Sequence, residues 1–408
     1  MFCIDQIKSP TGQVVLTLAA MLFAGFLATR VTKKLHLPNV TGYILSGILI
    51  GPYALGLVSK ASLASMDFVT DVALAFIAFG VGRYFKLADL KQSGLRVIVI
   101  TLTEALAAFA VVSLTMMLVF HLSPAFSLLL GAISSATAPA STIMTIRQYK
   151  AKGPFVDLIF QVVALDDAVA LIAFSVSATV LSMGGAERDV LTLLLPVVWN
   201  LLAVAMGALA GVLLHKMVDN GRSADHRLVL IVATLLLFTG LCSIAEISPL
   251  LSCMAIGAAY INASGRERTF EQVENATPPV ILLFFVLSGA RLEVPMLATA
   301  GVIGVVYFFV RILGKYAGAW VGCAVTHAPP LTTRYLGLAL VPQAGVSIGL
   351  AALAERIIPG PTGVMISTII LSSGVLYEMI GPACAKASLY LSHTLTRQQR
   401  PQGKMAHQ

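Results

Sequence analysis

Long apolar runs, separated by short charged or glycine-rich segments, fill almost all of the 408-residue chain. The runs are continuous rather than alternating with a period of two, which favours helices over the strands of a membrane barrel. Many approach the roughly 20 apolar residues that a bilayer-spanning helix needs. We therefore predict an all-α polytopic membrane protein with about 13 transmembrane helices, at residues 12–30, 40–58, 66–82, 93–120, 125–147, 154–182, 190–217, 226–245, 248–262, 276–290, 297–326, 332–355 and 361–391.

The composition agrees with this pattern. Hydrophobic residues make up 58% of the chain and charged residues 11%, too few to cover the surface of a soluble protein of this length. In lipid every backbone N–H and C=O must be paired within the protein, and a helix achieves this inside one segment. The first run is followed by RVTKK, so we interpret it as a retained helix and not as a cleaved signal peptide.

The positive charges fall mainly on one side of the predicted membrane. Of the 27 Lys and Arg residues, 20 lie in one alternate set of connections or near the C-terminal end, 5 lie in the other set, and Arg311 and Lys315 lie inside a helix. Cytoplasmic loops carry such an excess. We expect the N-terminus outside, the C-terminus in the cytoplasm, and a bacterial inner membrane as the location. The net charge of +8 then needs no nucleic-acid partner.

The chain segments on either side of the helix at 190–217 resemble each other. LAFIAFGVGRYFKLADL (74–90) matches LLFFVLSGARLEVPML (282–297), and GYILSGILIGPYALG (42–56) matches SPLLSCMAIGAAYIN (248–262). The offset is seven helices, an odd number, so we predict two six-helix repeats that lie inverted in the membrane. Inverted repeats with broken helices are typical of secondary transporters, which bind their ions near the membrane midplane.

Proline interrupts the fifth and twelfth predicted helices at matching positions. Pro139 stands in SSATAPAST (134–142) and Pro342 in ALVPQAGVS (339–347), where Gly345 adds backbone freedom. A proline inside a helix removes one hydrogen bond and clashes with the preceding turn. A kink that neighbouring helices repair is the simpler alternative for one proline. Two matched prolines favour two unwound segments whose carbonyl oxygens are free to coordinate a cation.

Two adjacent carboxylates, Asp166 and Asp167, lie in the apolar run FQVVALDDAVALIAF (160–174). A charge at the bilayer centre costs about 2.5–3.5 kcal/mol on insertion scales, and such residues are functional by default. Glu104 is the other acid deep inside a predicted helix. Further candidates are Asp71, Glu246 and Glu378, of which the last two lie near helix ends or in loops, where solvated charges are ordinary.

Burial and mutual repulsion both favour the protonated form of a carboxyl group. The pair can therefore carry protons and, when ionised, offers hard oxygen ligands to a small cation. Neighbours in a helix point about 100° apart, so the two carboxylates should have different partners and roles. The best cationic partner is Lys315 in FFVRILGKYAGAWVG (308–322), with Arg311 one turn before it. The alternatives are a purely structural salt bridge, or cations that extend to the membrane interface.

Several of these segments together resemble the monovalent cation:proton antiporter superfamily. They are LPNVTGYILSGILIGPYALGLV (37–58), LAFIAFGVGRYFKLADLK (74–91), ISPLLSCMAIGA (247–258) and LALVPQAGVSIGLA (338–351). The Asp-Asp pair is similar to that of the electrogenic, sodium/proton antiporter-like branch. The resemblance spans about 37–391. The short polar tail, 392–408, disfavours the potassium efflux relatives that carry a regulatory domain.

The resemblance implies a homodimer in which a dimerisation domain supports a mobile ion-transport core. The domain ranges are 1–92 and 226–294 for dimerisation, 93–185 and 295–391 for the core, 186–225 for a linking helix and 392–408 for a cytoplasmic tail. Asp167 would be the transient ligand of Na⁺ and of the proton. Asp166 would pair alternately with Lys315, and Thr137 would lie at the helix break. Supporting residues would be Glu104, Arg311, Pro139, Pro342 and Gln343. The resemblance implies no role for Arg291.

We therefore expect an antiporter that exchanges Na⁺ or Li⁺ for H⁺, electrogenically, with no cofactor and no enzymatic activity. K⁺/H⁺ exchange on the same scaffold is the first alternative, because nothing in the sequence measures the size of the site. A sodium-coupled symporter would need more polar residues in the helices. An intramembrane aspartyl protease needs two aspartates that converge from separate helices, which adjacent aspartates cannot do. A passive channel has no use for a tethered lysine.

Overall fold

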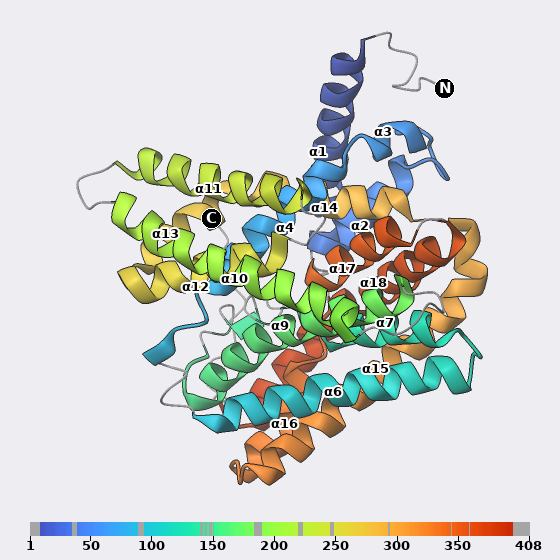
Figure 1. Ribbon diagram of the computed structural model, residues 1–408. Coiled ribbons are helices and arrows are strands. Elements are labelled where there is room, and N and C mark those ends of the chain that lie inside the picture. Colours follow the sequence, from blue (N-terminus) through green and yellow to red (C-terminus); the bar gives the residue numbers. More distant parts are fainter. Residues whose placement is uncertain are drawn as a thin grey trace, which may run out of the picture.

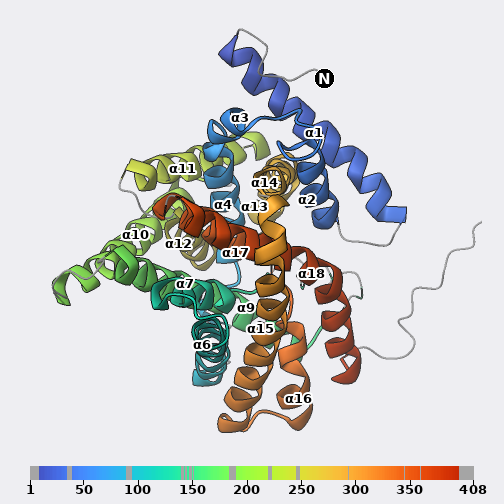
Figure 2. The same cartoon turned by 90° about the vertical axis from the view of Figure 1, so that its right-hand side faces the viewer.

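The computed structural model describes residues 9–34, 39–88, 94–138, 142, 145–146, 149, 151–182, 190–218, 223–244, 249–292, 294–343, 345–358 and 360–394. Within these ranges there are 17 helical segments and no strand, so the all-α prediction is confirmed (Figures 1 and 2). The segments are α1 (Pro10–Lys34), α2 (Asn39–Ile50), α3 (Lys60–Ala64), α4 (Asp67–Gly82), α6 (Leu95–Leu118), α7 (Pro124–Ser135), α9 (Pro154–Ser182), α10 (Val190–Met217), α11 (Ala224–Ile244), α12 (Pro249–Ser264), α13 (Glu267–Ala276), α14 (Pro278–Arg291), η2 (Val294–Met296), α15 (Leu297–Val325), α16 (Pro330–Ala339), α17 (Gly345–Ile357) and α18 (Pro361–Leu391).

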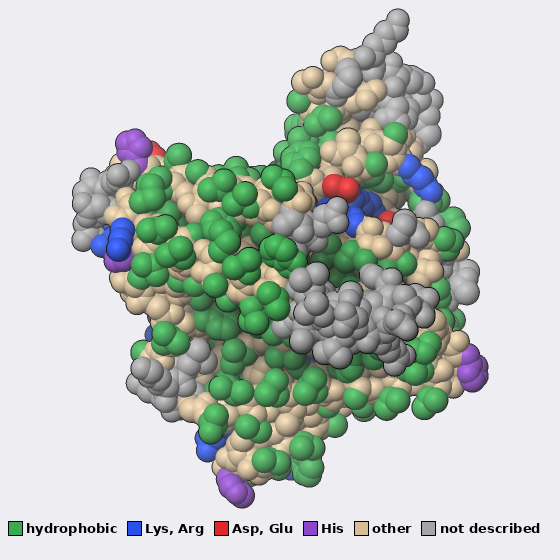
Figure 3. Space-filling model, in the orientation of Figure 1, with side chains coloured by type: hydrophobic (Ala, Val, Ile, Leu, Met, Phe, Trp, Pro, Cys, Tyr) green, Lys and Arg blue, Asp and Glu red, His purple; other side chains and the backbone are tan. Residues whose placement is uncertain are grey.

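The described helices are long and apolar enough for a membrane protein. Five can each cross a bilayer by length and composition, and the number rises to seven if two bent helix pairs each count as one span. Hydrophobic side chains are spread widely over the described part of the face shown in Figure 3, where charged side chains form only small patches. The count of 13 spans and the inverted repeat stay predictions.

Most predicted helix boundaries agree with the structure, and the differences have local causes. The predicted helix 40–58 ends at Ile50, because Gly51 and Pro52 follow. The predicted helix 332–355 divides into α16 and α17. The sequence analysis missed the short α3 and missed α13, whose polar face has too many charges to give an apolar run.

Two crossings of helices from opposite ends of the chain depend on glycine. A Cβ on Gly47 of α2 would meet the Val286 carbonyl oxygen of α14, and one on Gly289 of α14 would meet the Ile44 oxygen of α2. The α4–α12 crossing has the same reciprocal pattern, Gly82 with Met254 and Gly257 with Phe79. Backbone cannot move aside as a flexible side chain can. These four helices therefore form a tightly packed unit.

We predict that Gly289→Leu destabilises this unit by at least about 2 kcal/mol, since the added side chain overpacks a backbone contact. The matched control is Gly240→Leu in α11, where an added Cβ meets nothing within 4 Å. The control should keep or slightly raise the melting temperature, because leucine is the better helix former. Thermal unfolding of the two purified variants checks this. Equal melting temperatures would refute the role of glycine at the crossing.

A second group of helices contains α6, α7, α9, α15, α16, α17 and α18. Within it α15 runs beside α6 and α18, α7 packs between α6 and α9, and α17 packs on α18 (Figures 1 and 2). The two groups meet where α17 touches α4 and where α18 touches α2. This arrangement is compatible with the domain ranges given above, which stay a prediction.

Charged residues tie the two groups together near the N-terminal end of α4. Arg356 of α17 donates hydrogen bonds to Asp71 at 3.0 and 3.1 Å and to the Asp67 carbonyl oxygen at 3.1 Å. Arg291, at the end of α14, pairs with the Asp67 carboxylate and donates to the Leu63 carbonyl oxygen at 3.0 Å. Arg291 thus has a structural role that the sequence analysis did not find, and Asp71 belongs to this partly exposed network.

Candidate functional site

The two predicted helix breaks lie against each other. The α7 helix ends at Ser135, and Ala136 is extended with φ −68° and ψ 143°. The α16 helix ends at Ala339, and α17 begins at Gly345, whose φ of +23° is rarely adopted by other residues. The Ala138 amide donates to the Pro342 carbonyl oxygen at 2.9 Å, which joins the two unwound segments. Pro139 lies outside the described residues.

Side chains from α15 satisfy the carbonyl oxygens at the end of α7. The last four carbonyl groups of a helix have no partner within the helix. Arg311 donates from Nε to the Ser134 oxygen at 2.8 Å and from Nη2 to the Ala136 oxygen at 2.6 Å. Lys315 donates to the Ser135 oxygen between them. Both cations are fully buried.

The second break contributes the remaining bonds. Gln343 donates from its amide to the Ile133 oxygen at 2.8 Å, and also to the Tyr307 hydroxyl at 3.1 Å. Arg311 Nη1 donates to the Val341 oxygen at 2.8 Å. The four carbonyl oxygens of residues 133–136 are therefore all occupied. In the sequence analysis we expected the carbonyl oxygens at the breaks to be free for a cation. For these positions that expectation is wrong, because the buried end of a helix needs hydrogen-bond donors, and α15 and Gln343 supply them.

A glycine stripe on α15 brings its cations to the carboxylates. Gly314, Gly318 and Gly322 recur every four residues and therefore share one face of the helix. A Cβ on Gly318 would lie 2.5 Å from the Glu104 Cα of α6. Since only glycine permits this approach, the two backbones pack closely. Lys315 then reaches Glu104 directly.

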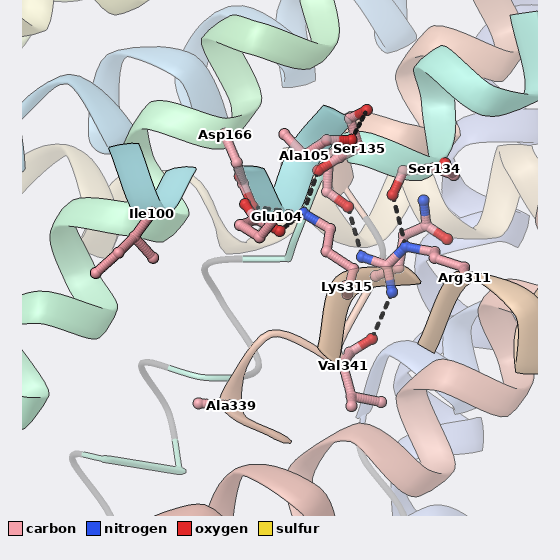
Figure 4. Close-up of polar contacts among 12 residues, drawn as sticks. Ile100, Glu104, Ala105, Ser134, Ser135, Asp166, Arg311, Lys315, Ala339 and Val341 are labelled. Atoms are coloured by element: carbon pink, nitrogen blue, oxygen red, sulfur yellow. Dashed lines mark hydrogen bonds and ion pairs between the residues drawn. The ribbon is translucent and has the colours of Figure 1, made fainter. Parts of the chain in front are cut away.

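Lys315 lies between two carboxylates at the centre of this site. Its Nζ is 2.7 Å from Glu104 Oε2 and 2.9 Å from Asp166 Oδ2, and all three side chains are fully buried. Figure 4 shows Glu104 and Asp166 directed at Lys315 from two different helices, α6 and α9. One cation thus faces two carboxylates from α6 and α9 and one carbonyl from α7. The sequence analysis assigned Lys315 to Asp166 alone.

Asp167 lies beside this cluster but forms no ion pair with Lys315. It is 1% exposed, yet within the described part of the chain neither carboxylate oxygen meets a side-chain hydrogen-bond donor. The Thr137 backbone lies close enough to interact with the carboxylate, and the Thr137 hydroxyl, also buried, is unpaired among the described residues. A buried carboxylate without a partner is costly unless a proton or a cation neutralises it.

Of the other acids singled out in the sequence, Asp71 is the one whose side chain the structure describes, and it lies outside this site. Asp71 pairs with Arg356, as described above. Glu246 lies outside the described residues, and Glu378 lies in α18 with a side chain that is not described. The structure therefore gathers Glu104, Asp166 and Lys315 in one contact.

A family model described as "Sodium/hydrogen exchanger, transmembrane" matches residues 18–381. The chain belongs to the sodium/hydrogen exchanger family. A search of curated proteins finds the high-affinity Na⁺/H⁺ antiporter NhaS3 of Synechocystis sp., 19% identical over 89% of this chain and 88% of that protein. It also finds the putative cation/proton antiporter YbaL of Escherichia coli, 29% identical over 33% of this chain and 23% of that protein.

Solved structures agree on the fold of this exchanger-family chain. The sodium proton antiporter MjNhaP1 from Methanocaldococcus jannaschii at pH 8 superposes with a TM-score of 0.74, at 19% identity, over 94% of this chain and 98% of that one. Taken together, the findings identify an integral membrane protein that acts as a cation:proton antiporter. Members of this family are transporters.

Proposed function

We propose that the protein exchanges Na⁺ or Li⁺ for H⁺ at Asp166 and Asp167, and that the exchange moves net charge. The observation that carries the proposal is the contrast between the two aspartates. Asp166 has a lysine partner at 2.9 Å, whereas the adjacent Asp167 is buried with both oxygens unpaired among the described residues. An unpaired carboxylate in this position needs either a proton or a small cation.

Competition for Asp167 explains the coupling of the two fluxes. A carboxyl group that holds a proton has lost its negative charge and binds a cation weakly, and a bound cation repels the proton. The hydroxyl of Thr137 adds a neutral oxygen ligand of the kind that Na⁺ and Li⁺ accept. Exchange then needs no separate gate to prevent both ions from being bound together.

Lys315 acts in this proposal as a counter-charge that Asp166 can exchange for a cation. When a cation binds to the aspartates, Lys315 leaves Asp166 and keeps its contact with Glu104, 2.7 Å away. When the cation leaves, Lys315 returns to Asp166. If a proton also displaces Lys315 from Asp166, as the cation does, the two aspartates carry two protons per cation, and the exchange moves net charge.

Alternating access requires the helix with the aspartates to move against its surroundings. Ala168, next to Asp167, lines an apolar cavity of about 510 Å³ between α9, α10 and α12. This space supports movement of the core ranges 93–185 and 295–391 against a dimerisation domain. The same proposal includes a homodimer in a bacterial inner membrane, with the N-terminus outside and the C-terminus in the cytoplasm.

K⁺/H⁺ exchange at the same residues is the alternative, and a single experiment decides between the two. The purified full chain is reconstituted in liposomes with a trapped pH dye and a potential-sensitive dye, and NaCl, LiCl, KCl or choline chloride is added. We expect Na⁺ and Li⁺ to dissipate an imposed proton gradient and to change the membrane potential. Activity with K⁺ alone would make the protein a potassium exchanger. Proton movement without a potential change would contradict electrogenic exchange, and no response to any cation would contradict antiport.

A further inference from the structure

Arg311 holds an unusual position among the buried charges. Its guanidinium is fully buried in the middle of α15. Within the described part of the chain no carboxylate lies within 4.0 Å of it, in contrast to Lys315 one turn later. A buried cation is expensive unless something negative compensates it.

Two helix ends supply that compensation. Arg311 donates to Ser134 and Ala136 at the end of α7 and to Val341 beyond the end of α16. The C-terminal end of a helix carries a partial negative charge, equivalent to about half an elementary charge. Two such ends meeting at one point therefore balance about one positive charge. Figure 4 shows the guanidinium between the two unwound segments.

Only arginine has the geometry for this contact. Its five N–H groups form a rigid planar fork that is always charged, whereas a lysine ammonium is a compact point charge. The three acceptors come from two different segments, so one ammonium cannot reach all of them in good geometry. The Tyr377 ring lies under the guanidinium, with 4.8 Å between the Arg311 Cζ atom and the ring centroid.

We propose that Arg311 is a positioning residue that sets the cation selectivity of the exchange site by keeping the carbonyl oxygens of both helix breaks away from the transported ion. With these oxygens occupied, the described side-chain groups that remain for the ion at Asp167 are the carboxylate oxygens and the Thr137 hydroxyl, a small set that suits a small ion. If Arg311 is removed, up to three carbonyl oxygens become available. Larger ions gain most from extra neutral oxygen ligands.

This inference rests on the proposed exchange at Asp167, and its test measures selectivity rather than activity. The variant is Arg311→Lys in the full chain, with Arg334→Lys at the exposed part of α16 as the control. Apparent KM values for Li⁺, Na⁺ and K⁺ come from exchange in liposomes. Apparent dissociation constants come from the rise of the melting temperature with LiCl, NaCl or KCl.

We expect the ratio of the apparent dissociation constant for K⁺ to that for Li⁺, and likewise the ratio of the two KM values, to fall by at least about fivefold in Arg311→Lys. A change of this size corresponds to the net free energy of about one hydrogen bond. The control should keep the ratio of the unmodified protein. An unchanged ratio, or an equal loss of rate for all three cations, would overturn the inference, because a merely structural role acts on every cation alike.

A second pair of variants decides the matter if Arg311→Lys does not fold. Tyr377→Leu removes the ring under the guanidinium. Tyr377→Phe keeps the ring and loses the hydroxyl, which donates to the Phe308 oxygen and also contacts the Arg311 side chain. We expect the ratio to fall in the leucine variant more than in the phenylalanine variant. Equal ratios in the two would overturn the inference. If the unmodified protein exchanges no cation, the proposed function fails; if it exchanges cations with an unchanged ratio in these variants, only the role of Arg311 fails.

Discussion

Asp167→Asn is expected to reduce cation-dependent proton movement to the level of protein-free liposomes. Asparagine keeps the shape of the side chain but can neither take up a proton nor carry a charge, so neither exchanged ion has a site. The same substitution should raise the free energy of unfolding by about 1 kcal/mol or more, and the melting temperature with it. The reason is that it removes a buried carboxyl group without a described side-chain partner. Lost transport together with a gain in stability is an outcome that misfolding cannot produce.

The matched control for this variant is Asp157→Asn, an exposed aspartate in the first turn of the same helix. The control should exchange cations at the rate of the unmodified protein. The melting temperatures of the unmodified protein and of Asp157→Asn should rise when NaCl or LiCl is added to about 100 mM, because a bound cation stabilises the folded state. The melting temperature of Asp167→Asn should not rise. Exchange by Asp167→Asn at the normal rate would exclude this residue as the site.

Lys315→Met is expected to produce the largest loss of stability of the variants considered. It leaves two buried carboxylates, Glu104 and Asp166, without their shared counter-charge. Removing one partner of a buried ion pair typically costs about 3–5 kcal/mol. Adding Glu104→Gln to Lys315→Met removes one of the stranded charges. We therefore expect the double variant to regain part of the loss, with a coupling of about 1 kcal/mol or more between the two sites.

Thermal unfolding of the single and double variants measures this coupling. Lys216→Met, at the exposed end of α10, is the control and should leave the melting temperature unchanged. If Lys315→Met melts at the normal temperature, the ion pairs around Lys315 contribute nothing to stability. If Glu104→Gln and Lys315→Met are strictly additive, Glu104 is not a partner of Lys315.

Much of the fold followed from local properties of the chain. The long apolar helices were predictable because hydrophobicity over about 20 residues is a property of one segment and does not depend on its neighbours. The predicted range 154–182 agrees with α9 to the residue. Polar or short elements were not predictable in this way. The α13 helix is stabilised by its buried Phe270 and Val273, a contact that the sequence pattern does not reveal.

The candidate site was predictable only in part. Features that depend on one segment could be predicted from the sequence, and contacts between segments could not. The sequence by itself determined that Asp166, Asp167, Glu104, Arg311 and Lys315 lie within apolar helices, because charges in such runs stand out whatever the packing. It also determined that helices break near residues 136–139 and 340–344, since proline acts on its own segment.

Only the tertiary structure decided the partners of these residues. Lys315 faces Glu104 as well as Asp166 because a glycine stripe lets α15 approach α6 closely. Arg311 donates hydrogen bonds to the carbonyl oxygens at both breaks because two helix ends from distant parts of the chain meet at its guanidinium. Contacts between segments far apart in sequence depend on the close packing of whole helices, which no single segment encodes.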